Sequence, residues 1–97
     1  MFARVAAFEG GDNKRLMELN NERMASGEMN PPEGIKRVMV LDDDAGRKRL
    51  FISFFDSREA VAAAEARFES MGDEIPKDIR GTRTSVDIYE ISLDQEI

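Results

Sequence analysis

The middle of the chain decides the fold: residues 38–55 read VMVLDDDAGRKRLFISFF. Two runs of β-forming residues, Ile35 to Leu41 and Lys48 to Phe55, flank a polar segment that changes from acidic to basic. Within it, Asp44-Ala45-Gly46 has the chemistry of a tight turn, because glycine takes a positive φ without steric cost. The stretch therefore predicts a β-hairpin. Its second strand is apolar on both faces, so we expect it at the centre of a sheet.

Before the hairpin, the chain adds one strand and one helix. Phe2 to Glu9 alternates as a strand. Lys14 to about Ser26 follows as a helix that Asp12 or Asn13 can cap, because their side-chain oxygens accept hydrogen bonds from free helix amides. The next residues, 28–34, contain two prolines and are expected to form a loop.

After the hairpin, the pattern repeats in the order helix, strand. Asp56-Ser57 is a capping signal, and the helix behind it has an apolar stripe at helical spacing, formed by Val61, Ala64, Phe68 and Met71. Residues 74–81 form a connecting arm with room for one helical turn, and Thr82 to Leu93 is the last strand. The full order predicts one α+β domain over residues 1–97. Its expected form is ferredoxin-like, βαββαβ, with a four-stranded antiparallel sheet and both helices on one face.

The composition excludes several kinds of chemistry. The 97 residues include no cysteine, histidine or tryptophan, which removes disulfides, thiolate catalysis, the commonest general base and the commonest metal ligand. The formal net charge of −6 disfavours binding to nucleic acid or to anionic membranes. The stretch that reaches Glu9 is too short and too charged for a signal peptide, and no run is long enough to span a bilayer. We therefore expect a cytoplasmic protein without metal or cofactor.

Alternation along the strands sorts their residues into two faces. One set is wholly apolar and is expected to lie under the helices: Ala3, Val5, Ala7, Val38, Val40, Leu50, Ile52, Phe54, Val86 and Ile88. The other set mixes apolar and polar residues: Phe2, Arg4, Ala6, Phe8, Arg37, Met39, Leu41, Arg49, Phe51, Ser53, Phe55, Asp87, Tyr89 and Ile91. So many exposed aromatic rings would exceed the apolar patch that monomers tolerate. We therefore expect a homodimer in which a second copy shields Phe2, Phe8, Phe51 and Phe55.

Three segments carry a resemblance to a known superfamily: the strand 2–11 that ends in Glu9-Gly10-Gly11, the segment 54–60 and the last strand around 83–90. With these, and over essentially its whole length, the chain resembles the dimeric α+β barrel superfamily. Members include the antibiotic-biosynthesis monooxygenases and the stress-responsive barrel proteins. The resemblance implies subunits that pack sheet to sheet.

Departures from that superfamily narrow what the resemblance implies. Its haem-degrading members use an Asn, a Trp and a His, and two of these residue types are missing here. Its cofactor-free monooxygenases, which oxidise electron-rich phenols through positioning groups, are the closer comparison. Their cleft lies in the layer between helices and sheet, which the sorting above makes fully apolar in this chain. No residue can be carried over as catalytic.

Five residues are candidates for binding a ligand: Arg4, Arg37, Ser53, Asp87 and Tyr89. Arg4 and Asp87 are expected on one face of neighbouring strands, where the five would form a polar pocket for an anion or a phenol. The structural alternative is a cross-strand ion pair between Arg4 and Asp87 that fixes the register at the dimer interface. Tyr89 has a structural alternative too, because strand tyrosines more often pack their rings and leave the hydroxyl to water or a carbonyl.

Two further motifs match known sites only superficially. Asp42-Asp43-Asp44 lacks the glycine and the glutamate at the spacing of a calcium loop, which predicts a solvated turn. Gly10-Gly11 follows a strand and precedes a helix, as in phosphate-binding loops, but without their spacing or lysine it predicts a tight turn.

Three functions follow as hypotheses. The first is a small-molecule-binding protein that takes a hydrophobic or aromatic ligand between helices and sheet, with a cofactor-free oxygenase or isomerase as its catalytic form. The second is a non-catalytic dimeric binding or stress-response protein. The third is an RNA-recognition-like domain, because Arg47 to Phe54 matches part of that motif, although Lys48 and Arg49 depart from it. A helix–sheet pocket of roughly 300 Å³ or more with Tyr89 or an arginine favours the first, and an exposed Phe51 on bare sheet favours the third.

Overall fold

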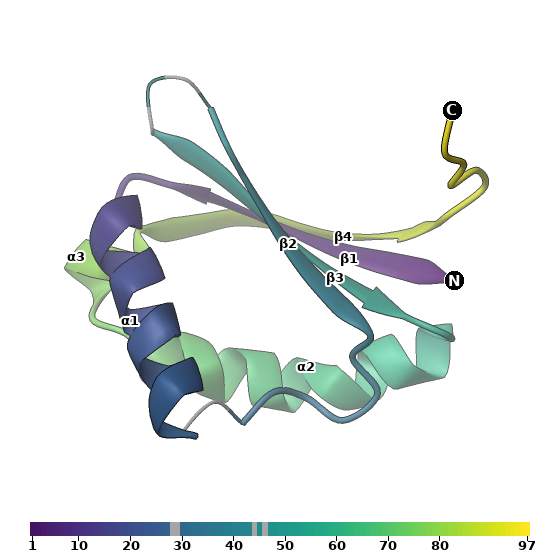
Figure 1. The fold of residues 1–97 in the computed structure, drawn as a ribbon, viewed down its shortest axis with the longest axis horizontal. Coiled ribbons are helices and arrows are strands. Elements are labelled where there is room, and N and C mark those ends of the chain that lie inside the picture. Colours follow the sequence, from purple (N-terminus) through teal and green to yellow (C-terminus); the bar gives the residue numbers. More distant parts are fainter. Residues whose placement is uncertain (28–29, 44, 46) are drawn as a thin grey trace.

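The computed structural model describes residues 1–27, 30–43, 45 and 47–97, and shows one antiparallel sheet with helices on one side (Figure 1). In chain order the elements are β1 (Phe2–Glu9), α1 (Asn13–Ser26), β2 (Arg37–Asp42), β3 (Lys48–Phe55), α2 (Arg58–Asp73), α3 (Lys77–Arg80) and β4 (Thr82–Glu90). The four strands lie in the order β2-β3-β1-β4. The predicted α+β class, the antiparallel sheet and the central place of β3 are confirmed.

The element limits differ little from those expected. β2 begins at Arg37 rather than Ile35, because the Ile35 amide is part of a turn and donates to the Pro32 carbonyl. β4 ends at Glu90 rather than Leu93, and the connecting arm holds its helical turn as α3. The predicted turn residues Asp44 and Gly46 lie outside the described residues, as do 28 and 29 of the predicted loop.

Both long helices begin at the predicted caps. The Asp12 carboxylate accepts a hydrogen bond from the Arg15 amide at 3.1 Å, and the Ser57 hydroxyl accepts one from the Ala60 amide at 3.1 Å. These bonds satisfy amides that have no partner within the first helical turn. Gly27 ends α1 with φ +76°, a left-handed conformation that suits glycine.

The core lies between α2 and the middle of the sheet. Its buried residues are Phe55, Val61, Ala64 and Phe68, so the helical stripe seen in the sequence is the packed one. The rings of Phe55 and Phe68 meet edge to face with centroids 6.2 Å apart, a favourable aromatic geometry. In Figure 1 the other side of the sheet carries no helix.

The predicted faces of β1 and β3 are wrong. The residues that face the helices are the mixed set of these two strands, Phe2, Arg4, Ala6, Phe8, Arg49, Phe51, Ser53 and Phe55. In register with them are Val38, Val40, Val86 and Ile88 of the outer strands, for which the prediction is confirmed. The bare face holds Ala3, Val5, Ala7, Leu50, Ile52 and Phe54, beside Arg37, Met39, Leu41, Asp87 and Tyr89.

The prediction of these faces is wrong because two arginines are buried on the helix side. Arg4 is 2% exposed and places its guanidinium 4.1 Å from the centre of the Phe68 ring. Arg49 is 4% exposed and lies 5.5 Å from the centre of the Phe8 ring. Stacking on an aromatic face lets an arginine enter a packed layer, so a charged residue did not mark the solvent side.

The expectation that a second copy shields Phe2, Phe8, Phe51 and Phe55 is therefore wrong as well. Phe55 is fully buried inside the subunit, and Phe2 and Phe51 pack against the same core cluster. Phe8 is half-buried and faces the space under the helices. A partner, if present, would cover a different set of side chains.

Candidate functional site: a cleft between helices and sheet

A cleft of about 850 Å³ lies between α1, α2 and the helix side of the sheet. It exists because α1 does not close onto the sheet. None of the α1 residues is buried, and its apolar side chains Leu16, Met17 and Leu19 are half-buried at the cleft wall. The volume is in the range of pockets that hold small organic ligands.

Polar contacts at its ends hold α1 in this position. At its start, the Asp12 amide donates to the Ile79 carbonyl at 2.9 Å. Further along, Arg23 forms an ion pair with Glu74 at 3.4 Å between Nη1 and Oε2. These contacts attach α1 to the segment around α3, so that α1 does not pack directly against the sheet.

Apolar side chains make up most of the cleft surface. Val40 and Phe51 line the sheet side, and Phe68 lines the α2 side. The Phe51 and Phe68 rings meet edge to face at 6.5 Å. Because Phe51 packs inward in this way, it is not the exposed platform on bare sheet that the RNA-recognition hypothesis requires.

Arg4 is held by a carboxylate from α2. Its Nε donates to Glu65 Oε1 at 2.6 Å and its Nη2 donates to Oε2 at 3.3 Å, a two-point contact. The expected Arg4–Asp87 pair is wrong, because Arg4 lies opposite Ile88 and Asp87 lies opposite Val5 on the bare face. The Arg4 charge is thus compensated inside its own subunit.

Arg49 is bound only to neutral groups among the described residues. Its Nη2 donates to the Arg80 carbonyl at 2.6 Å, and its Nη1 donates to Asn13 Oδ1 at 3.4 Å. Asn13 in turn donates to Asp42 Oδ2 at 2.9 Å, so it lies between the two charges. Burial lowers the pKa of the Arg49 guanidinium from its ordinary value, while Asp42 acts in the opposite direction.

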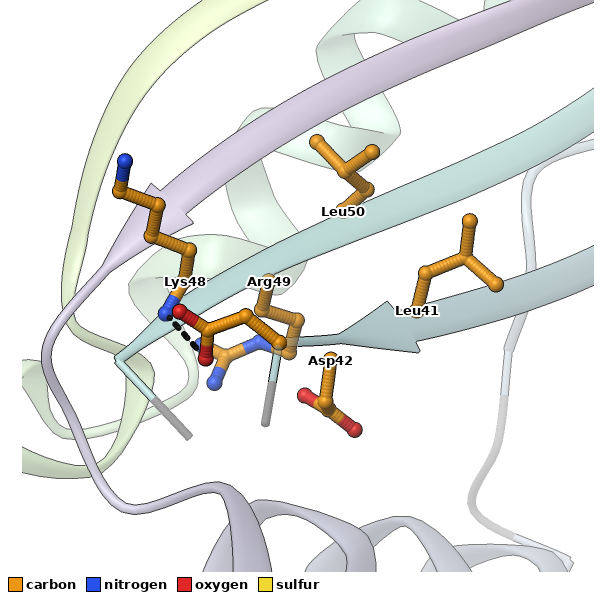
Figure 2. A pocket seen from close by; sticks show the side chains of 6 residues that line it. Leu41, Asp42, Lys48, Arg49 and Leu50 are labelled. Atoms are coloured by element: carbon orange, nitrogen blue, oxygen red, sulfur yellow. Dashed lines mark hydrogen bonds between the residues drawn. The ribbon is translucent and has the colours of Figure 1, made fainter. Parts of the chain in front are cut away.

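Figure 2 shows the same arginine from the hairpin side. Asp42 and Arg49 extend to one side of the two strands, whereas Leu41 and Leu50 extend to the other, as the cross-strand pairs require. A hollow of about 290 Å³ lies here, next to the Asp43 carboxylate that accepts the Lys48 amide at 3.2 Å. It is small, so the cleft is the better candidate.

The five candidate residues do not form one pocket. Arg4 lines the cleft, and Ser53 lies beside it on the same face, fully buried, with no described partner for its hydroxyl. Arg37 and Tyr89 lie on the bare face, on opposite edge strands, and Arg37 is 5.9 Å from the centre of the Phe54 ring. Asp87 shares the bare face with Tyr89.

The structure tests two motifs that resemble known sites, the glycine pair Gly10-Gly11 and the acidic residues before the hairpin turn. Gly10 and Gly11 have φ of +74° and +79°, and a Cβ at Gly11 would lie 2.5 Å from the Ile79 carbonyl oxygen. The glycine pair is therefore the predicted tight turn, required by close packing. Among the described residues, no group of three or more acidic side chains is arranged to hold a metal ion.

Sequence reasoning missed Arg49 and the residues of α1 as parts of this site. A signal for Arg49 was available: an arginine within a run of β-forming and aromatic residues has rings nearby on which to stack. The unfilled space under α1 had no such signal, because a stripe of leucine and methionine predicts a packed helix and a cleft wall equally well.

No family model matches the chain, and the comparison with curated proteins finds no match. Within the described residues, no helix combines the length and apolar character that crossing a bilayer requires.

Proposed function

We propose that this protein binds a small, largely apolar organic molecule in the cleft between its helices and its sheet. The observation that carries the proposal is a cleft of about 850 Å³ with an apolar lining and two buried arginines. The apolar walls of such an open cleft are in contact with water, which is unfavourable. A ligand with an apolar body would remove this surface from water.

The proposal includes a ferredoxin-like subunit that pairs through its bare sheet face. The element order and the strand order β2-β3-β1-β4 support it. The bare face supports it too, because its centre consists of Val5, Ile52 and Phe54, with Leu50 and Tyr89 more exposed around them. A second copy would remove this apolar surface from water.

We favour binding over catalysis. Tyr89, one of the five candidate ligand-binding residues, lies on the bare face, away from the cleft. The acidic residues that line the cleft are Glu69 and Asp73, and Glu69 already pairs with Arg83 at 2.8 Å. A cofactor-free oxygenase that positions a phenol in the same cleft stays the catalytic form of this proposal.

The test uses a neutral fluorescent probe, N-phenyl-1-naphthylamine, and two neighbouring residues of β2. Val40 lines the cleft and Met39 lies on the bare face, and both are half-buried. Val40→Trp should fill part of the cleft and weaken probe binding about tenfold or more, as expected when an apolar ligand loses its space. Met39→Trp should leave the affinity within about twofold, a shift of a few tenths of a kcal/mol.

Thermal unfolding would be measured on both variants, because a bound probe raises the stability of the native state by mass action. The proposal fails if the native protein does not bind the probe. It also fails if Met39→Trp weakens binding as much as Val40→Trp, because the probe would then occupy the bare face.

A further inference from the structure

The arginines of this chain differ in whether a carboxylate compensates them. Six described arginines are buried or half-buried: Arg4, Arg15, Arg23, Arg49, Arg67 and Arg80. Four of these form ion pairs with glutamates, whereas Arg49 and Arg80 form none with the described carboxylates. Both exceptions line the cleft. In a chain with 20 acidic and 14 basic residues, carboxylates are plentiful, so this local absence calls for an explanation.

The two arginines are connected through the backbone at the end of α3. Arg49 Nη2 donates to the Arg80 carbonyl, and Arg80 Nη1 donates to the Gly72 carbonyl at 2.6 Å. Carbonyl oxygens satisfy hydrogen bonds but carry no net charge. A guanidinium has five N–H donors, and Arg49 uses two of its own on described groups. Donors of this buried guanidinium therefore remain for a ligand, and in the described contacts Asp42 is linked to it only through Asn13.

We propose that Arg49 binds the anionic group of an amphipathic ligand whose apolar body lies in the cleft. The inference rests on the proposed function and names the ligand class: an organic monoanion, such as a carboxylate or sulfonate on a bulky apolar skeleton. The planar guanidinium suits such groups because it can donate two parallel hydrogen bonds. Burial strengthens the attraction, since screening by water and salt is weak there.

Two probes of the same skeleton test the inference. 1-Anilinonaphthalene-8-sulfonate carries a sulfonate, and N-phenyl-1-naphthylamine is the same molecule without it. The native protein should bind the sulfonate about tenfold more tightly, which is the size expected of charge-assisted hydrogen bonds. Fluorescence titration at two salt concentrations would give both affinities.

Arg49→Met should remove the preference for the sulfonate, so that the two probes bind with similar affinity. Arg49→Lys should keep part of the preference, because it retains the charge without the planar fork. Arg37→Met is the matched control: it removes an arginine that stacks on an aromatic ring of the bare face, so the preference should stay. If Arg49→Met does not fold, the proposal is tested by the native protein's preference for the sulfonate and by its partial retention in Arg49→Lys.

The outcomes separate the two proposals. Equal affinity of the native protein for both probes overturns the anion site and leaves the cleft proposal standing. Loss of the preference in Arg37→Met rather than in Arg49→Met also overturns it, because the anion would then bind to the bare face. Failure of the neutral probe to bind would instead contradict the proposed function itself.

Discussion

On the two faces of the sheet, burial runs against polarity: the face that contains the arginines is covered, and the more apolar face is exposed. Apart from the end pair Glu9 and Lys48, the bare face of β1 and β3 holds only apolar side chains. The helix-covered face of the same strands holds Arg4 and Arg49. Both arginines are nearly inaccessible to water, while Leu50 on the bare face is 38% exposed. Partners explain the difference: each buried arginine has an aromatic ring to stack on and acceptors for its N–H groups. For these two arginines, burial follows from available partners rather than from hydropathy.

The largest expected effect separates two adjacent phenylalanines of β3. Phe55 is fully buried in the core, and Phe54 is half-buried on the bare face. Phe55→Ala should lower the free energy of unfolding by about 3–5 kcal/mol, because it leaves a cavity against Phe68. Phe54→Ala should cost about 1 kcal/mol. Urea denaturation of both variants measures the difference, and equal losses would mean that the faces are assigned incorrectly.

Two lysine substitutions would show whether a second copy of the chain covers the bare face. Ile52 lies at its centre, opposite Val5 and Met39, and Met24 is an exposed methionine of α1. If the chain is a dimer through this face, Ile52→Lys should raise the dimer dissociation constant about a hundredfold, since it buries an unpaired ammonium. Met24→Lys should leave it unchanged.

Sedimentation over a range of concentrations would measure both variants. A native protein that stays at 10.9 kDa throughout would contradict the dimer. It would not affect the cleft, which is formed within one subunit.

The sequence was sufficient to predict the helices, the strands and the buried stripe of α2, because these follow from local periodicity and caps. Val61, Ala64 and Phe68 are buried as their spacing predicts. The sequence was not sufficient to predict which face of β1 and β3 meets the helices. A period of two divides a strand into two sets of residues, but which set meets the helices depends on packing far along the chain. Here Phe68 of α2 selects the set that contains Arg4.

The candidate site was predictable only in part, for the same reason. Arg4 was among the candidates, but its partner is Glu65, which lies 61 residues away on another element. Asp87 lies on the face away from the helices, as predicted, but Arg4 was wrongly expected beside it, because which face of β1 meets the helices cannot be read from the strand alone. The cleft depends on how α1 is held by Ile79 and Glu74, which are tertiary contacts with no local signal.

The smallest expected effect concerns an ion pair at the rim of the helix-covered face. Glu69 of α2 accepts a hydrogen bond from Arg83 of β4 at 2.8 Å, and this bond, with the Arg83 charge, lowers the pKa of the Glu69 carboxyl below its ordinary value. The folded state therefore holds this proton less tightly than the unfolded state. The pair stabilises the fold above the ordinary glutamate pKa, and that contribution disappears as pH falls through the lowered value.

Arg83→Gln should return the Glu69 pKa toward its ordinary value, which NMR titration of the side-chain carboxyl would detect. The stability difference between the native protein and Arg83→Gln should be small at neutral pH, because an exposed pair is screened by water, and smaller still in acid. Glu69→Gln is the control that removes the titrating group. A Glu69 midpoint that Arg83→Gln leaves unmoved would show that β4 and α2 are not joined at this rim. The cleft would then be open along the β4 edge, which is the side where Arg83 and Glu69 line it.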